Sequence, residues 1–341
     1  MSKRPPLFRA RARASLAALA AGALSLGLVA CGNVQDSSSQ PSSAPAAQPG
    51  AFPVSITHKF GTTTIDKSPA KVVVVGTSTD DLDAALALGV TPVGFFSKTS
   101  SPEKVPSWLT GKLDPAKTQI VNATNGVDAE AVRKLSPDLI LATADYGLED
   151  EYPNLVKVAP TIGFEKEWGG QSWQQHVQVV GKALGKPAEA ETLIKDTEAK
   201  IAKAKADHPG AQGKTFTASV GNAPGKIFTL VSKDDFAVKL VEQLGLTLNP
   251  AVADATKNEA GSPTGTLTPE QYDKLASNLV IIAFTSPELR KAFEDNQLVQ
   301  NVKNGNYLVV DMETISQLRA PSALGIPWVI EKLNPGLRKL T

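Results

Sequence analysis

The stretch KVVVVGTSTDDLDAALALGVTPVGFF occupies residues 71–96 and decides the fold class. Its first part, KVVVVG, is continuously apolar, which is typical of a strand buried on both faces of a parallel sheet. Residues 77–89 predict a helix, because hydroxyl and acidic residues favour its start and Gly89 favours its end. TPVGFF at 91–96 predicts a second strand. This order of strand, helix and strand indicates a β-α-β unit with a parallel sheet.

The same alternation continues along the chain in two sets. In the first set, DAEAVRKL (128–135) predicts a short helix before the strands DLILATA (138–144) and TIGF (161–164). In the second set, strands and helices are expected at TFTASVG (215–221), IFTLVS (227–232), FAVKLVEQLG (236–245), LVIIAFT (279–285), NYLVVD (306–311) and in a C-terminal helix from Pro321 to about Leu333. The expected fold class is therefore α/β, with two Rossmann-like lobes whose central sheets are mostly parallel.

A long helix is expected between the two sets. Its sequence is PAEAETLIKDTEAKIAKAKADH at 187–208. One face of this helix carries a mainly apolar stripe, formed by Ala190, Leu193, Ile194, Thr197, Ile201 and Ala204. About twenty residues at 1.5 Å each reach ~30 Å, so this helix is long enough to connect both lobes. We place the N-terminal lobe at 54–170, the connecting helices at 171–208 and the C-terminal lobe at 209–341.

The N-terminus predicts export and lipid attachment. Residues 1–30 combine five basic residues with an apolar run that is shorter than the ~20 residues of a membrane span. A secretory signal peptide is therefore expected, rather than an N-terminal core helix. Leu28-Val29-Ala30-Cys31 resembles a bacterial lipobox, which implies a lipid on Cys31 and a place on the extracytoplasmic face of the cell membrane; a structural thiol is the alternative. Residues 31–53, after the signal peptide, are expected to be a disordered tether.

Charge and residue content exclude several function classes. Five of the 35 basic residues lie in the leader, which leaves 30 against 34 acidic ones and argues against nucleic-acid binding. The three histidines show no metal-ligand spacing, so no metal site is expected. Neither a phosphate-binding loop nor a GxSxG elbow is found in the part expected to fold. We therefore expect a protein that is not an enzyme and carries no intrinsic cofactor. A monomer is expected because no exposed apolar patch can be identified in the sequence.

Most of the chain resembles a family of transport proteins. In order, its blocks resemble the substrate-binding proteins that serve ABC importers of ferric siderophores, haem and cobalamin. These blocks cover roughly residues 60–340 and read IDKSPAKVVVVGTSTDDLDAALALGVTPVG, DAEAVRKLSPDLIL, EDEYPNLVKVAPTIGF, SWQQHVQVVGKALGKPAEAETLI, FAVKLVEQLGL, LTPEQYDKLASNLVII and LVQNVKNGNYLVVD. The resemblance implies two α/β lobes joined by one long helix, a ligand cleft between the lobes, and an ABC-transporter permease dimer as the partner.

The two halves also share a pattern that the resemblance assigns to permease docking. Residues 126–141 and 265–282 each contain a glycine, a helix cap and a glutamate at the second helical position. The resemblance implies that these glutamates, Glu130 and Glu270, dock into arginine pockets of the permease. As the alternative, a glutamate in a first helical turn merely stabilises the helix dipole, by about 0.3–1 kcal/mol.

Ligand-binding residues are expected in loops at the carboxyl ends of the strands, where open α/β sheets bind their ligands. Aromatic walls with a few cations suit a ferric siderophore, because rings cover its organic shell and guanidinium groups pair with its oxygens. The candidates are Thr77, Ser78, Phe95, Tyr146, Trp168, Lys233, Arg290 and Arg319. A place in the core is the alternative for Phe95.

Other ligands and other functions stay open at this point. Haem or cobalamin would suit the same family, and Tyr146 is a residue type that ligates haem iron. An exported α/β hydrolase-like protein would need a serine–histidine pair, which only Ser172 and His176 suggest. An adhesion lipoprotein with the same fold is a further alternative. The loops do not distinguish hydroxamate, catecholate, citrate and mixed siderophores.

Overall fold

The computed structural model describes residues 52–99, 101, 103–258 and 262–340. The chain divides into two units, residues 1–46 and residues 47–341, and the described residues all belong to the second. The predicted signal peptide, Cys31 and most of the predicted tether therefore lie outside the described residues. Within the described part of the chain, no helix is both long enough and apolar enough to cross a membrane.

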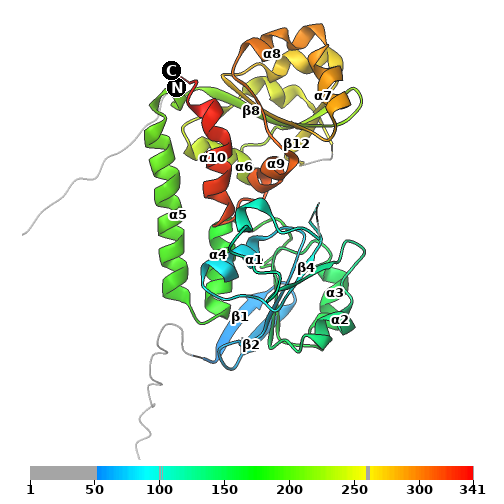
Figure 1. Ribbon diagram of the computed structural model, residues 1–341, viewed down its shortest axis with the longest axis vertical. Coiled ribbons are helices and arrows are strands. Elements are labelled where there is room, and N and C mark those ends of the chain that lie inside the picture. The colour runs from blue at the N-terminus through cyan, green and yellow to red at the C-terminus, as the bar shows by residue number, and fades with distance from the viewer. Residues whose placement is uncertain (1–51, 100, 102, 259–261, 341) are drawn as a thin grey trace, which may run out of the picture. The chain divides into compact units, whose positions relative to one another are not determined.

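The N-terminal lobe, which contains β1, β2 and β4 in Figure 1, is built on a parallel sheet. Its strand order is β5-β4-β3-β6-β7. Its strands are β3 (Val72–Gly76), β4 (Gly94–Ser97), β5 (Gln119–Asn122), β6 (Leu139–Ala142) and β7 (Thr161–Gly163). Each described pairing between neighbours in this sheet is parallel, as the β-α-β pattern predicts. A separate antiparallel hairpin, β1 (Val54–His58) with β2 (Gly61–Ile65), precedes the sheet.

Helices of the N-terminal lobe follow the strands as expected, with one difference in α1 (Asp80–Ala87). Its acidic first turn suits the helix dipole, but all three acids of that turn, Asp80, Asp81 and Asp83, are buried instead of facing water. Buried carboxyls need partners. Asp80 accepts a hydrogen bond from the nearby Ser78, whereas Asp81 and Asp83 accept theirs from distant segments. The remaining helices of the lobe are η1 (Ser107–Leu109), α2 (Ala129–Lys134) and α3 (Leu148–Leu155).

The C-terminal lobe contains a mixed sheet rather than a mostly parallel one. The main strand order is β11-β12-β9-β8-β13-β14, with β10 also paired to β8. β8 runs parallel to β13 and β10 but antiparallel to β9. The reversal follows from the short turn after β8, where Gly225 adopts a φ of 67°. The strands are β8 (Thr215–Ala223), β9 (Lys226–Leu230), β10 (Thr247–Leu248), β11 (Thr256–Lys257), β12 (Thr264–Leu267), β13 (Leu279–Phe284) and β14 (Tyr307–Val309).

The helices of this lobe pack around the mixed sheet. They are α6 (Phe236–Gln243), η3 (Pro250–Asp254), η4 (Pro269–Leu275), α7 (Pro287–Glu294), η5 (Gln297–Val299), α8 (Gln300–Asn304), α9 (Met312–Arg319) and α10 (Gly325–Leu337). The C-terminal helix begins later than predicted, because residues 321–324 form a turn. In this turn the hydroxyl of Ser322 accepts a hydrogen bond from the backbone N–H of Gly325 at 3.1 Å.

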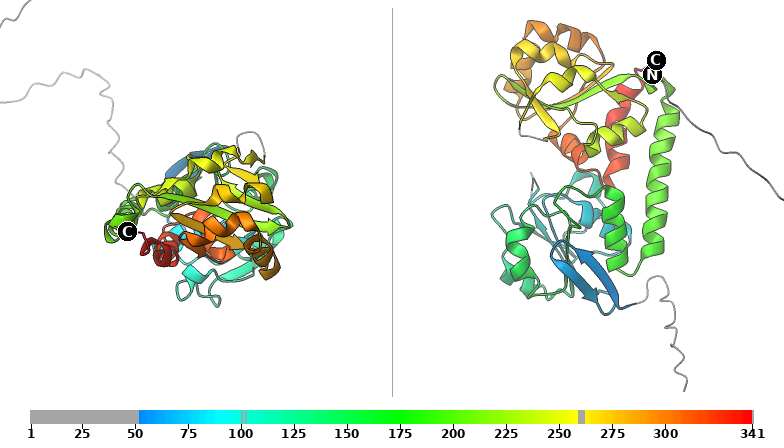
Figure 2. Two further views of the ribbon diagram at one scale, coloured as in Figure 1. Left: turned by 90° about the horizontal axis from the view of Figure 1, so that it is seen from above. Right: turned by 180° about the vertical axis from the view of Figure 1, so that it is seen from behind.

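The connector agrees with the sequence pattern. α4 (Trp173–Ala183) leads into α5 (Pro187–Asp207), whose 21 residues correspond to ~30 Å. The predicted stripe is buried except for Leu193, which is only partly buried. α5 packs against α4, which leads into it, and also against α6 and α10 of the C-terminal lobe. Figure 2 shows α5 and α10 side by side in the view from behind. The exact lobe boundaries at 170 and 209 stay predictions, because residues 47–341 form one unit.

Two apolar clusters form the core. The larger one is continuous from Val74 in the first sheet through Ile194 in α5 to Ile281 in the second sheet. The smaller one, which includes Val75 and Leu148, lies in the N-terminal lobe. Because the larger cluster includes both sheets and the connector, side-chain packing restrains the two lobes relative to each other.

Candidate ligand cleft between the two lobes

A cleft of about 780 Å³ lies between the lobes, at the carboxyl ends of strands from both sheets. The N-terminal lobe supplies the loops that follow β3 and β4 and the segment that enters η1. The C-terminal lobe supplies β8, β9, β12 and one face of α9. The lining residues include Thr77, Ser78, Lys98, Lys104, Ser107, Trp108, Phe228, Glu313, Gln317 and Arg319. The position of the cleft follows the rule that open α/β sheets bind ligands beyond the carboxyl ends of their strands.

Arg319 brings a positive charge to the cleft from the C-terminal lobe. It is the last residue of α9 and is exposed, and among the described residues it has neither a hydrogen bond nor an ion pair. Its charge does act on Asp235, the cap of α6. Burial raises the pKa of Asp235, and nearby donors and the Arg319 guanidinium partly oppose that rise. Arg319 therefore keeps its donors available for an anionic or oxygen-rich group in the cleft.

Lys98 lines the N-terminal side of the cleft, where two carboxylates hold its ammonium group. Its Nζ lies 2.8 Å from Oδ1 of Asp145 and 2.7 Å from Oε1 of Glu151, and all three side chains are largely buried. Burial raises the pKa of Glu151, while the hydrogen bond from Lys98 opposes this rise. Sequence reasoning missed Lys98 as a cleft residue. Its place one residue after β4, at the carboxyl end of the strand, was the signal that could have found it.

Direct contacts join the two lobes along one side of the cleft. The backbone N–H and the hydroxyl of Ser107 each donate to the carboxylate of Glu313, at 2.6 Å. The ring of Trp108 packs against that of Trp328 in α10, with 5.5 Å between centroids. Deeper in the same region, Asp83 of α1 accepts hydrogen bonds from both Trp108 and Ser322. These contacts therefore hold the two lobes together along one side of the cleft.

Three predicted ligand residues, Thr77, Ser78 and Arg319, line this cleft. Tyr146 and Trp168 are not among the lining residues but lie beside it. They are 69% and 45% exposed, and their rings meet edge to face with centroids 5.0 Å apart. The backbone N–H of Tyr146 donates to the hydroxyl of Thr77 at 3.0 Å, which places Tyr146 at the rim. The structure thus brings these five residues to one region.

The other three predicted ligand residues lie away from the lining. Phe95 is 1% exposed and belongs to the apolar core, as its alternative interpretation had it. Arg290 lies on α7, where its Nε donates to Oε1 of Glu294 at 2.8 Å. Lys233 is exposed in the loop between β9 and α6. Only Lys233 lies in a loop that follows a strand, whereas Phe95 lies inside β4 and Arg290 inside α7. The sequence pattern does not encode the direction of these side chains, and none of them lines the cleft.

The geometry of two lobes, one long helix and a cleft matches a known family. Residues 72–263, more than half of the chain, match the model of the family described as periplasmic binding protein. The chain belongs to the periplasmic binding protein family. Members similar to it are substrate-binding proteins of transport systems and not enzymes.

Named relatives of this binding protein connect the family to ABC transport and iron. YhfQ of Bacillus subtilis, named as an ABC transporter substrate-binding lipoprotein, is 25% identical over 84% of this chain and 90% of its own length. The Fe(3+) dicitrate-binding periplasmic protein FecB of Escherichia coli is 24% identical over 62% of this chain and 67% of its own. The crystal structure of PiaA of Streptococcus pneumoniae in complex with ferrichrome has a TM-score of 0.67 and 25% identity, covering 84% of this chain and all of the other.

The two glutamates expected to face a permease both lie in first helical turns. Glu130 follows the cap Asp128 in α2; it is exposed and forms an ion pair with Arg133 at 2.7 Å. Glu270 is exposed in η4, where a hydrogen bond from Thr268 lowers the pKa of its carboxyl. A capping box formed by Thr268 and Gln271 begins η4 and does not use Glu270. Both carboxylates are therefore exposed at the surface and not buried in the core.

The histidines of this binding protein serve the fold. His58 and His176 are buried; His58 hydrogen-bonds to Thr63 at 2.9 Å, and His176 Nδ1 lies 2.7 Å from the Thr143 hydroxyl. His208 ends α5 and contacts Asn334 of α10 at 3.0 Å. In the part of the chain that the structure describes, no group of three or more His, Cys, Asp or Glu residues is arranged to hold a metal ion.

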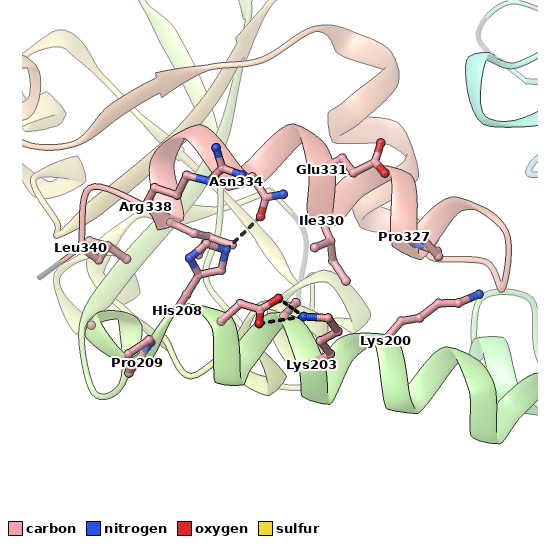
Figure 3. A pocket seen from close by; sticks show the side chains of 14 residues that line it. Lys200, Lys203, His208, Pro209, Pro327, Ile330, Glu331, Asn334, Arg338 and Leu340 are labelled. Carbon is pink, nitrogen blue, oxygen red and sulfur yellow. Dashed lines mark hydrogen bonds and ion pairs between the residues drawn. The ribbon is translucent and has the colours of Figure 1, made fainter.

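A second hollow, about 830 Å³, lies between the C-terminal part of α5 and α10 (Figure 3). Two polar pairs line it: Lys203 pairs with Asp207 at 2.7 Å, and His208 with Asn334. The hollow lies beside the connector and not at the carboxyl ends of the two sheets. Although it is as large as the cleft, it lacks the geometry by which α/β sheets bind ligands, so we assign the ligand to the cleft.

Proposed function

We propose that this protein captures a ferric siderophore in the cleft between its lobes and delivers it to an ABC importer for iron uptake. The observation that carries the proposal is the cleft itself, with the exposed Arg319 on one wall and the exposed Lys104 on the other. Cations on both lobes can contact the oxygen-rich surface of a ferric complex from two sides at once. The iron would be held by the oxygens of the siderophore, so it is cargo and not a resident cofactor.

The size and the walls of the cleft suit such a cargo. A volume of about 780 Å³ lies within the ~300–1,000 Å³ of sites that enclose small molecules. Apolar side chains, among them Phe228 and Trp108, cover part of the wall, and the aromatic pair at the rim, Tyr146 with Trp168, extends it. Rings at these places would cover the organic part of a siderophore. The names of two relatives, which mention ferric dicitrate and ferrichrome, are consistent with this cargo.

Delivery would occur by docking of both lobes on a permease dimer. Glu130 and Glu270 offer one exposed carboxylate on each lobe, so a single copy of this protein could contact both permease subunits. We therefore propose that the protein works as a monomer. The connector would keep the two glutamates at a fixed spacing, because α5 packs against elements of both lobes.

A lipid on Cys31 would hold the protein on the extracytoplasmic face of the membrane. Two or three acyl chains are sufficient for stable anchoring, since each buried methylene contributes ~0.8 kcal/mol. The name of the relative YhfQ, a lipoprotein, supports the proposal. In fractionated cells, C31A should move the protein from the membrane to the soluble fraction. Retention of C31A in the membrane would contradict the anchor.

Tryptophan fluorescence tests the cargo, because Trp108 lines the cleft and Trp168 lies at its rim. The purified full chain is titrated with ferrichrome, ferric dicitrate, a ferric catecholate, haem and cobalamin. Saturable quenching by a ferric siderophore, weakened in R319A, supports the proposal. Saturation by haem or cobalamin alone would replace the cargo, and no response to any of the five would favour an adhesion lipoprotein.

A further inference from the structure

Asp83 is a buried acid with no place in the function described so far. It lies on α1 and is 0% exposed. Its Oδ2 accepts a hydrogen bond from Nε1 of Trp108 at 2.9 Å and another from the hydroxyl of Ser322. Oδ1 is also buried and has no partner among the described residues. A buried carboxyl oxygen without a hydrogen-bond partner costs free energy, so its presence calls for an explanation.

Two of the donors to Asp83, Trp108 and Ser322, belong to opposite lobes. Trp108 is in η1 of the N-terminal lobe, whereas Ser322 lies between α9 and α10 of the C-terminal part, 239 residues from Asp83. Trp108 lines the cleft, and so does Gln317 of α9, whose Nε2 donates to the Ser322 hydroxyl at 2.6 Å. A continuous chain of hydrogen bonds therefore runs from one cleft wall to the other through Asp83 and Ser322.

The direction of each bond in this chain is determined. The oxygen of Ser322 accepts from Gln317 and from the backbone N–H of Gly325 at 3.1 Å, which uses both of its lone pairs. Its own O–H must then donate to Asp83. The lack of a side chain at Gly325 is required here, because a Cβ at that position would lie 1.7 Å from Nε2 of Gln317. The backbone of α10 is thus shaped around this network.

We propose that Asp83 is a positioning residue for the ligand: by holding Trp108 on one side and Ser322 with Gln317 on the other, it fixes the two cleft walls relative to each other. The ligand does not touch Asp83, which acts only through these neighbours. The test of this inference by ligand binding rests on the proposed function, whereas its test by tryptophan fluorescence does not.

The protonation of Asp83 provides a way to test this role. Burial raises the pKa of Asp83 to about 8. The charge of Asp80 also raises this pKa, whereas the hydrogen bonds from Ser322, Trp108 and Thr79 lower it. At neutral pH the group is therefore mostly a neutral acid. Ionisation would leave a charged Oδ1 with no donor in the apolar region between the lobes, so the network should open to admit water.

Other charged groups around this region bear on the same pH range. On α1 itself these are Asp80 and Asp81, and on α4 His176, which lies 3.6 Å from Asp81. On the remaining neighbours they are Lys112 at the carbonyl of Trp108, Glu313 at Ser107, and Lys332 over the ring of Trp328. The variants below separate Asp83 from these groups.

The first readout is the fluorescence of Trp108 in the full chain without ligand, isolated as the difference between the wild type and W108F. Across the pH range around 8, the wild type should show a transition in this difference spectrum, and D83N should not, because asparagine copies the neutral acid and keeps an acceptor for both donors. The absence of a transition in the wild type, or the same transition in D83N, would overturn the proposal.

The second readout is the affinity for ferrichrome and for ferric dicitrate. If binding needs the protonated form, affinity should fall about tenfold between about pH 7 and about pH 9. D83N should keep its neutral-pH affinity throughout, and D196N, at an exposed acid on α5, should behave like the wild type. An equal fall in D83N and the wild type would overturn the proposal.

A further variant, G325A, perturbs the network from the other lobe and keeps the proposal testable if D83N does not fold. Its added methyl group must displace Gln317, so it should weaken the affinity at neutral pH and remove the Trp108 transition. Wild-type affinity and an unchanged transition in G325A would contradict the proposal. If neither ferric complex binds any variant, the proposed function fails, and the Trp108 readout still decides the role of Asp83.

Discussion

The Nζ atom of Lys98 lies 2.8 Å from the buried carboxylate of Asp145. Lys98 lines the wall of the cleft, and Asp145 immediately precedes the rim residue Tyr146 in the sequence. Glu151 approaches the same ammonium group at 2.7 Å and also accepts a hydrogen bond from the backbone of Val127. Lys98, just after β4, is thus connected to the loop after β6 and to α3, and through Glu151 to the segment before α2. The N-terminal wall of the cleft is therefore organised by charge as well as by packing.

Removal of Lys98 should destabilise the protein strongly. K98M leaves two carboxylates close together and poorly solvated, which we expect to lower the free energy of unfolding by about 3–5 kcal/mol. Denaturant unfolding measures the change. The control is K203M, which removes an exposed lysine paired with Asp207 and should cost less than about 1 kcal/mol. Equal small effects of the two variants would show that the Lys98 pairs do not stabilise the wall.

Arg319 should matter for the cargo, and Arg290 should not. R319A removes a charged donor that faces the cleft, so affinity for the ferric siderophore should fall by about tenfold or more, from a loss of about 1.5–3 kcal/mol. R290A removes an equally exposed arginine that already pairs with Glu294 on α7. We expect R290A to bind as the wild type does in the fluorescence titration. A greater loss in R290A than in R319A would place the cargo elsewhere.

Charge reversal at the docking glutamates should separate uptake from binding. The double variant E130K/E270K should abolish iron uptake by whole cells, while siderophore affinity and Tm stay close to the wild type, because both side chains are exposed and away from the cleft. E288K is a matched control. Glu288 is also exposed in a first helical turn, and a hydrogen bond from Ser286 lowers the pKa of its carboxyl. Normal uptake in E130K/E270K would reject the docking assignment.

His176 should make stability depend on pH. Burial disfavours its charged form, but Asp80 and Asp81 outweigh this effect and raise the pKa of His176 above 6.5. The folded state then binds a proton that the unfolded state releases, so this stabilisation is complete below pH 6.5 and is lost as the pH rises through the folded-state pKa. Unfolding of the wild type and H176Q at several pH values should show a difference in stability that shrinks as the pH rises. A difference independent of pH would contradict this.

Much of the architecture could be predicted because local patterns encode it. The continuous apolar runs at β3, β6 and β13 predict buried strands, and the stripe and the flanking Pro187 and His208 predict α5 nearly to the residue. The antiparallel β8–β9 hairpin was harder, because a strand buried on both faces has the same apolar pattern in either direction.

Side-chain networks between distant segments could not be predicted. Asp83 reads as a helix-initiating acid, and nothing in its surroundings in sequence points to Trp108 or to Ser322. The direction of a side chain within a loop is likewise absent from the pattern. For this reason Thr77 and Arg319 reach the cleft, whereas Phe95 and Arg290, chosen by the same rule, do not.

The location of iron in crystals of the protein grown with the siderophore that quenches its fluorescence tests the central proposal most directly. The anomalous signal of iron should give one peak in the cleft, between the Arg319 side of α9 and the loops after β3 and β4. A peak in the hollow between α5 and α10, or bound iron coordinated by protein side chains in place of the siderophore, would contradict the account.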